Sequence, residues 1–327
     1  METLKIIKKP RLRHPYLIVA WPGMGEVAFK AASYLIEELK AQEFAEIKAE
    51  EFFYLTGSAV QSGILEAPLL PQGKFYYWKN PVKRAGLVKN DLVIFLSNAQ
   101  PDLAKADNYA KAIIDLAKMV GVEMVVSFAS MPQPTDHTQE SRLWFAASDQ
   151  KIKEMLSKYN FGVLEDGQIS GMNGLFLGIA KKEGLKGFCL LGDIPLYTIQ
   201  IENPKASAAV LTGLGKVLSM QINVQPLREQ AQAMENEINK LLDYLKLGNA
   251  GQSSPIGEEE VELIKKTLSQ LTKLPASVKE RIEGLFEQSR LDISKASELK
   301  VELDKWNVYK EYEDRFLDLF RKKDKGH

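Results

Sequence analysis

Short apolar runs alternate with amphipathic segments along roughly the first two thirds of the chain. Apolar runs of this length, bounded by Gly, Pro or polar residues, are typical of strands buried on both faces of a sheet. The clearest runs are residues 16–21, 91–97, 122–128 and 187–191. Apolar residues three and four positions apart predict helices, and the expected helices are residues 27–39, 101–119, 148–158, 172–183 and 204–219. This alternation predicts an α/β fold of three layers, with a mostly parallel or mixed sheet between helices.

The pattern changes between the first predicted helix and residue 91. Three short segments are rich in aromatic or apolar residues and separated by Gly or Pro: 52–54, 63–65 and 75–78. Such segments predict an antiparallel ribbon. It forms either the edge of the sheet or an exposed aromatic contact between subunits.

From Gln225 onward the strand pattern stops. Apolar residues then alternate steps of three and four, as in a short coiled-coil seam, through Leu227, Ala231, Met234, Ile238, Leu241 and Leu245. This helix either packs back on the core or joins two chains. We therefore divide the chain into an α/β core (1–224), a coiled-coil-like helix (225–247), a Gly- and Ser-rich linker (248–257) and an all-helical region (258–327). Within that region the expected helices are 258–273, 275–289 and 294–322.

Composition and charge exclude several classes of protein. Lys plus Arg and Asp plus Glu are both 43, so bulk charge does not favour nucleic acid or an anionic membrane as a partner. No apolar run is long enough to span a bilayer. The first residues lack the apolar core of a signal peptide, so we expect a cytoplasmic protein. The single cysteine, Cys189, lies in a predicted strand, and we expect its thiol to be buried in the core and inert.

Two loops follow predicted strands at the position where open α/β sheets bind ligands. The first contains Pro22, Gly23, Gly25 and Glu26, and its Gly-x-Gly-x-x-Ala string fits a dinucleotide fingerprint. The fit is weak, because Pro22 precedes the first glycine and no distinctive acid follows about 20 residues on. The glycines equally suit a tight turn from strand to helix.

The second loop runs from Ser97 to Pro101 and offers the amides of Asn98 and Gln100. These amides suit either a polar ligand or the capping of turns and helices. The remaining candidate for catalysis is His137, in a loop after the third strand. No Gly-x-Ser-x-Gly elbow accompanies it, and no second cluster of ligand residues predicts a metal. We expect no catalytic residues, no metal and no cofactor.

Several strings together resemble the PAC2 (proteasome assembly chaperone 2) family. They occur in the family's order, and cover about residues 10–245: Trp21-Pro-Gly-Met-Gly-Glu-Val-Ala28, Gly171-Met-Asn-Gly-Leu-Phe-Leu177, Gly187-Phe-Cys-Leu-Leu-Gly-Asp193, Ile201-Glu-Asn-Pro-Lys-Ala206 and Ile222-Asn-Val224. Asn173 of the second string joins Pro22, Gly23, Gly25, Glu26, Asn98, Gln100 and His137 as a candidate ligand-binding residue.

The resemblance implies a core similar to nucleoside-phosphorylase-like α/β proteins and assembly into homo-oligomers, with a trimer as one form. Eukaryotic members of the family are chaperones that help to order proteasome subunits. Some archaeal members end in a hydrophobic-Tyr-any tail that docks on the proteasome, whereas this sequence ends in Arg321-Lys-Lys-Asp-Lys-Gly-His327. The leading hypothesis is a non-catalytic, self-associating chaperone-like protein. The alternative is an enzyme, or relic of one, that binds a nucleoside- or phosphate-bearing ligand at the two loops.

Overall fold

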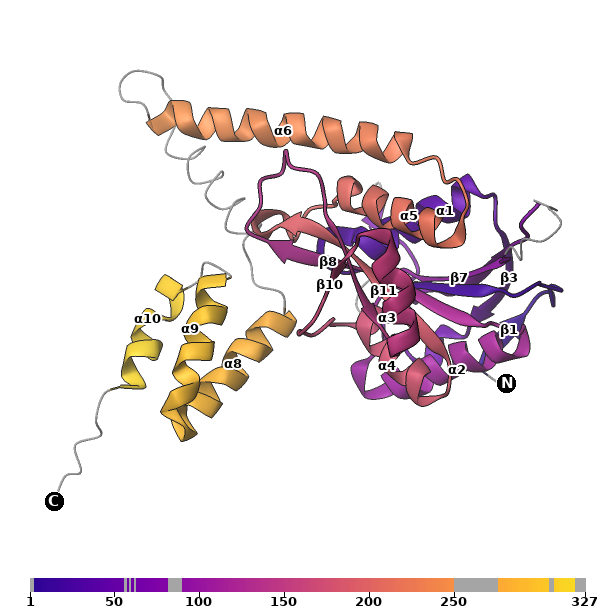
Figure 1. Ribbon diagram of the computed structural model, residues 1–327, viewed down its shortest axis with the longest axis horizontal. Coiled ribbons are helices and arrows are strands. Elements are labelled where there is room, and N and C mark those ends of the chain that lie inside the picture. The colour runs from indigo at the N-terminus through magenta and orange to yellow at the C-terminus, as the bar shows by residue number, and fades with distance from the viewer. Residues whose placement is uncertain are drawn as a thin grey trace. The chain divides into compact units, whose positions relative to one another are not determined.

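The computed structural model describes residues 3–55, 58, 60–61, 63–81, 90–249, 276–305 and 309–320. The chain forms two compact units, Met1–Gly257 and Glu258–His327. The first unit is an α/β sandwich built on one large sheet (Figure 1).

The sheet is mixed, with a parallel centre. Its described strands lie in the order β1 (Leu4–Ile6), β3 (Gln42–Ile47), β6 (Gly73–Trp78), β7 (Leu92–Ser97), β2 (Tyr16–Ala20), β8 (Met124–Gln133), β11 (Lys186–Pro195), β9 (Leu143–Ala147) and β10 (Gly162–Val163). β7, β2, β8 and β11 are parallel to one another. β6 pairs antiparallel with both β3 and β7, and β9 pairs antiparallel with β11.

Helices cover both faces of the sheet (Figure 1). α1 (Val27–Glu38) and α5 (Pro204–Leu218) pack together on one face, and α2 (Ala106–Met119) and α4 (Met172–Lys182) on the other. α3 (Gln150–Leu156) packs beside β9, and α6 (Gln225–Asn249) packs on the outside of α5. The predicted α/β class with helices on both faces of a mixed sheet is therefore confirmed.

The core follows from the apolar runs that predicted the central strands. Leu17 to Trp21 are fully buried, because β2 lies in the middle of the sheet with helices on both sides. On the α2/α4 face Trp21 is surrounded by aromatic rings, with centroids 5.5 Å from Phe95, 5.6 Å from Phe176 and 6.4 Å from Tyr109. Tilted ring pairs at these distances add to the stability that burial itself supplies.

Sequence and structure differ most at the two sides of the sheet. β9 was not predicted although Leu143–Ala147 is itself a short apolar run, and β10 has only two residues, too few to form a pattern. Of the three segments predicted as an antiparallel ribbon, 52–54 is not a strand, and Ile64–Leu65 pairs with Val60–Gln61 in a separate two-stranded sheet. The third is β6, which lies inside the large sheet rather than at its edge, with Phe75 and Tyr77 buried.

The C-terminal unit contains α8 (Ala276–Leu291), α9 (Ala296–Lys305) and α10 (Tyr309–Asp318). A single helix over 294–322 was therefore the wrong expectation, since α10 packs against α9. Leu299, Leu303 and Phe316 share one core with Ile282 and Phe286 of α8. The helix expected at 258–273 lies outside the described residues, as does most of the expected linker, whose first two residues belong to α6.

Candidate functional site

The carboxyl ends of β2, β7, β8 and β11 meet at one edge of the sheet, since these strands are parallel. The loops that carry Pro22–Glu26, Asn98 and Gln100, and His137 all leave from this edge. Asn173, at the start of α4, joins them through hydrogen bonds. The structure thus brings the sequence-predicted residues to the edge where an α/β sheet carries its ligand site.

Asn173 holds the end of β2 as a neighbouring strand would. Its Oδ1 accepts from the backbone N of Trp21 at 3.0 Å, and its Nδ2 donates to the backbone O of Trp21 at 3.0 Å. The side chain of Asn173 is buried, and so is Trp21. Buried backbone N–H and C=O groups need partners, so this amide satisfies the residue at which β2 leaves the sheet.

Gln100 connects the same turn to α4. Its Nε2 donates to the backbone O of Pro22 at 2.6 Å, while its Oε1 accepts from the backbone N of Met172 at 2.9 Å. Asn98 acts at a different place, because its Oδ1 accepts from the backbone N of Gln72 at 2.8 Å. All three predicted amide residues therefore hydrogen-bond to the protein's own backbone.

The two glycines of the first loop differ in conformation. Gly25 has φ +64°, a left-handed conformation that favours glycine. Its N donates to the O of Ile199 at 2.8 Å, and its O accepts from the N of Asn203 at 2.7 Å. Gly23 is extended, with φ −166°. The Gly25 amide is thus bonded to the β11–α5 connection, and Gly25 serves the turn that joins β2 to α1.

Glu26 is the strained residue of this loop. It has φ +50°, which costs an L-residue on the order of 1 kcal/mol. Burial raises the pKa of its carboxyl, and the nearby Glu202 carboxylate raises it further. Glu202 itself pairs with Lys30 at 2.9 Å.

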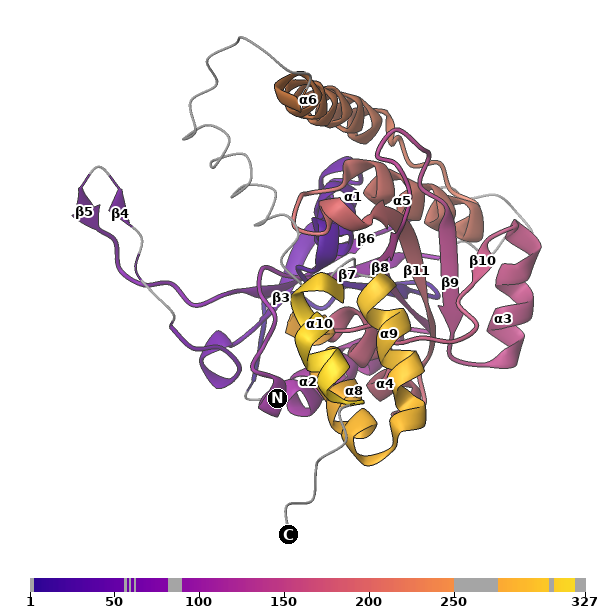
Figure 2. The same ribbon diagram turned by 90° about the vertical axis from the view of Figure 1, so that its left-hand side faces the viewer.

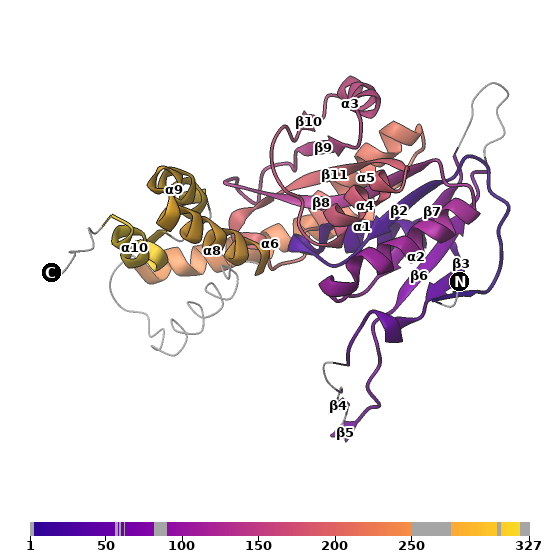
Figure 3. The same ribbon diagram turned by 90° about the horizontal axis from the view of Figure 1, so that it is seen from below.

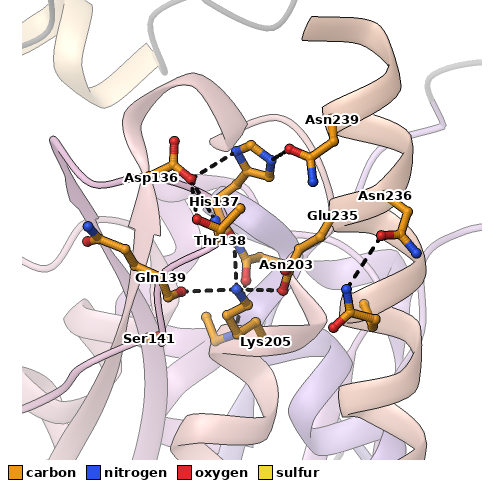
Figure 4. A network of polar contacts seen from close by, with 12 residues as sticks. Asp136, His137, Thr138, Gln139, Ser141, Asn203, Lys205, Glu235, Asn236 and Asn239 are labelled. Atoms are coloured by element: carbon orange, nitrogen blue, oxygen red, sulfur yellow. Dashed lines mark hydrogen bonds and ion pairs between the residues drawn. The ribbon is translucent and has the colours of Figure 1, made fainter. Parts of the chain in front are cut away.

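His137 joins the loop after β8 to α6 (Figure 4). The Tyr197 hydroxyl accepts from the backbone N of His137 at 2.8 Å and lies 2.8 Å from its Nδ1. Because the hydroxyl already accepts one N–H, we assign its own proton to Nδ1. Nε2 then carries hydrogen and donates to Oδ1 of Asn239 on α6, at 2.9 Å. Both ring nitrogens of this buried histidine are engaged in holding structure.

Lys205 makes the second connection to α6 (Figure 4). Its Nζ donates to the backbone O of His137 at 2.6 Å and of Gln139 at 3.0 Å, and pairs with Oε1 of Glu235 at 2.6 Å. The side chains of Lys205 and Glu235 are only 17% and 16% exposed. Apolar contact supports the pair, since Leu227 and Ala231 of α6 are buried. Within the single chain, α6 packs on α5.

Sequence reasoning did not single out Lys205 or Glu235. Lys205 lies in a string quoted for the family resemblance, but nothing local distinguishes it from a solvated lysine. The only usable signal was Glu235 on the face of α6 next to Ala231 and Met234. A charged residue beside an apolar seam indicates an ion pair at the rim of a helix contact.

A projecting segment forms the most exposed apolar surface of the first unit. We call residues 54–72 the arm; it carries the hairpin β4 (Val60–Gln61) and β5 (Ile64–Leu65), which stands away from the sheet and helices (Figures 2 and 3). Leu70 is half-buried, but six other large apolar side chains of the arm are 56–85% exposed, and they are Tyr54, Leu55, Val60, Ile64, Leu65 and Leu69. Within the arm only Glu66 is charged.

Both ends of the arm are anchored to the sheet layer. Before it, Phe52 and Phe53 are buried against Tyr109, with ring centroids 4.9 and 5.7 Å away. After it, Gln72 exchanges hydrogen bonds with Asn98: the backbone N of Asn98 donates to the O of Gln72 at 3.1 Å, and the reverse bond uses the Asn98 side chain. Asn98 therefore fixes the arm's root rather than facing an open crevice.

Two further classes of site were searched for. Among the residues that the structure describes, no group of three or more His, Cys, Asp or Glu side chains lies close enough to hold a metal ion. Within the same residues, no helix is both long and apolar enough to cross a bilayer.

The fold and this edge define an α/β protein whose strand-end loops are closed by its own side chains. The sequence profile of the PAC2 family matches residues 17–242, and the chain belongs to that family. The family resemblance drawn from the sequence is thereby confirmed.

Similar proteins include two solved structures and one protein known by sequence. Pyrococcus furiosus PbaB, an archaeal proteasome activator, is 28% identical with a TM-score of 0.63, over 73% of this chain and 98% of PbaB. PbaA of the same organism, an archaeal homolog of proteasome-assembly chaperone, is 23% identical with a TM-score of 0.57, over 76% and 94% of the two chains. The uncharacterized protein MJ1210 of Methanocaldococcus jannaschii is 26% identical over 80% of this chain and 96% of its own length.

Replacing Asn173 tests its role at the end of β2. Asn173→Ala leaves the buried N–H and C=O of Trp21 without their partner, so we expect the free energy of unfolding to fall by about 2–4 kcal/mol. Urea denaturation measures this. Asn98→Ala is the matched control, because its single bond is exposed, and we expect a loss of under about 1 kcal/mol. Equal losses in the two variants would contradict the assignment.

The raised pKa of Glu26 predicts a pH-dependent stability. Since its folded-state pKa lies above the unfolded value, folding is favoured while the carboxyl is protonated. That contribution is complete below the unfolded pKa and is lost as pH rises through the folded one. Glu26→Gln should therefore raise Tm at pH 7 by about 1–3 °C, with a smaller difference at pH 4. A Glu50→Gln control should show no such trend, and an E26Q gain that persists at low pH would refute the cause given.

Lys205 and Glu235 should stabilise α6 jointly. Lys205→Met leaves a largely buried carboxylate unpaired, so we expect a loss of about 2 kcal/mol. The double variant K205M/E235Q should lose less than the two single effects added, in a double-mutant cycle. Hydrogen exchange should quicken in α6 of K205M. Lys240→Ala breaks an exposed pair on the same helix and should change neither measurement by much; additive losses in the cycle would count against direct coupling.

Proposed function

We propose that this chain is a non-catalytic, self-associating protein of the cytoplasm that acts as a chaperone-like partner of other proteins, proteasome subunits among them. Membership of the PAC2 family supports a protein-binding role, and the likeness to PbaB, an archaeal proteasome activator, supports a proteasome-related partner. The observation that carries the proposal is the arm, residues 54–72, with its exposed apolar side chains.

The strand-end loops support binding of proteins over catalysis. In an enzyme of this architecture, backbone N–H groups and polar side chains at the carboxyl edge face the substrate. Here the amides of Asn173 and Gln100 are bonded to the turn after β2 and to the start of α4, and the N–H of Gly25 is bonded to Ile199. A ligand at this edge would have to displace these internal bonds.

The arm supplies what a protein-binding surface requires. Monomeric proteins seldom expose contiguous apolar patches larger than a few hundred Å², and a two-stranded hairpin is marginally stable by itself in water. The β4–β5 hairpin combines both features, because it pairs only two residues on each strand and exposes Ile64 and Leu65. Contact with a second copy of the chain, or with a partner, would stabilise the hairpin and cover its apolar surface.

Size-exclusion chromatography with light scattering tests self-association. We expect the wild-type chain to form a homo-oligomer, and the double variant Ile64→Asp, Leu65→Asp to shift it towards the monomer with an unchanged circular-dichroism spectrum. Val301→Asp is the matched control, since Val301 is 67% exposed but lies in α9. When the same proteins are used as bait, the wild type and the control should capture proteasome subunits from the source organism, and the double variant should capture fewer.

A wild-type chain that is strictly monomeric and captures no protein would overturn the proposal. So would a nucleotide or phosphorylated metabolite that stabilises the chain in a thermal-shift panel and loses its effect in Gly25→Asp. That result would favour the alternative of an enzyme-like ligand site at the strand-end loops.

A further inference from the structure

A further groove runs along α5, and the loop after β8 contributes Glu140 and Ser141 to its lining. It has a volume of about 400 Å³, within the usual range for ligand pockets. One wall is α6, and the other is the start of β9 with the segment before β10. Small side chains of α5 and α6 leave the space open, and they are Ala208, Ala209, Gly213 and Ala231.

Two cations lie at one end of this groove. Lys216 in the last turn of α5 and Arg228 in the first turn of α6 both line it, and both side chains are exposed. Neither has an ion pair or side-chain hydrogen bond within the described part of the chain. Lys216 suits the negative end of its helix dipole, but Arg228 occupies the positive end of α6, where a cation is unfavourable. Helix stability therefore does not account for Arg228, whereas binding of an anion would.

The middle and far end of the groove have a different character. Tyr159 and Phe161 line its middle as a stacked, half-buried pair, with ring centroids 5.6 Å apart and planes 18° from parallel. At the far end are Glu140 and the Lys205–Glu235 pair. The groove is thus basic at one end, aromatic in the middle and polar at the other.

We propose that this groove binds an extended, acidic segment of a partner protein. Carboxylates of the segment pair with Lys216 and Arg228, and an apolar side chain packs against Tyr159 and Phe161. The lining of α5 from Lys205 to Lys216 is about 16 Å long at 1.5 Å per residue. That length matches about five residues of extended chain. An open groove of this length suits an extended peptide.

The inference takes from the proposed function only that the partner is a protein. The groove and the arm involve different residues, so each can fail alone. Arm variants should leave peptide binding unchanged, and groove variants should leave the oligomeric state unchanged.

A random pentapeptide library selected on the full-length protein tests the groove. We expect the selected peptides to be enriched in Asp and Glu next to an apolar residue. Fluorescence anisotropy of one labelled peptide should then show binding that weakens about tenfold in the charge-reversed variant Lys216→Glu, Arg228→Glu, and that weakens with added salt. Phe161→Ala should also weaken it. Lys48→Glu, an exposed lysine at the end of β3 outside the groove, is the matched control.

Three results would overturn the inference. One is a selection with no acidic enrichment, and another is peptide binding that charge reversal leaves intact while circular dichroism shows a folded chain. The third is calorimetric binding of ATP that the same charge reversal abolishes, in the absence of peptide binding, because the groove would then hold a small anion.

Discussion

The parallel centre of the sheet imposes the constraint on which the rest of the first unit depends. Four neighbouring strands end at one edge, and where β2 leaves the sheet the residue Trp21, with its backbone N–H and C=O groups, is fully buried. Such groups must be paired. In this protein the partners are side chains and loops that arrive from distant parts of the sequence, and Asn173, 152 residues from Trp21, is the clearest example.

Hydrogen bonds at the same edge also fix the first turns of α4 and α5. The Gln100 side chain pairs with the first turn of α4 while it holds Pro22. Asn203 bonds to Gly25 through its backbone, and its side chain caps α5 by accepting from the N of Ala206. These contacts form a joint that fixes α4 and α5 against the sheet. Because α6 rests on α5 through Lys205 and Glu235, its position follows from the same joint.

The sequence predicted those parts of the fold whose signal is local. β2 and β7 lie within one residue of their expected bounds, whereas β8 and β11 run five and four residues beyond the expected ends, past Phe128 and Leu191, where the apolar runs stop. β9 was missed although it is itself a short apolar run, and β10 was missed because two residues form no pattern. The resemblance to PAC2 proteins rested on sequence segments that also contribute residues to these buried contacts.

The roles of the candidate site residues were harder to predict, because the sequence does not show which groups a side chain hydrogen-bonds. An Asn or Gln after a strand suits a ligand and a backbone equally well, and only the fold shows that Asn173 faces Trp21. His137 presented the same ambiguity, since its partners Tyr197 and Asn239 are 60 and 102 residues away. The cations of the groove gave no signal at all, because Lys216 and Arg228 come together only when α5 and α6 pack.

The two interaction surfaces proposed for the first unit lie at opposite ends of the sheet. The arm connects β3 to β6, near one side, whereas the groove is bounded by β9 and the segment before β10 at the other. A copy held through its arm would therefore keep its groove free. Apolar contact suits lasting association between copies, and an exposed basic end suits fast, salt-sensitive capture of an acidic segment. This division matches what a chaperone-like assembly factor requires, since it must keep its own form while its partners come and go.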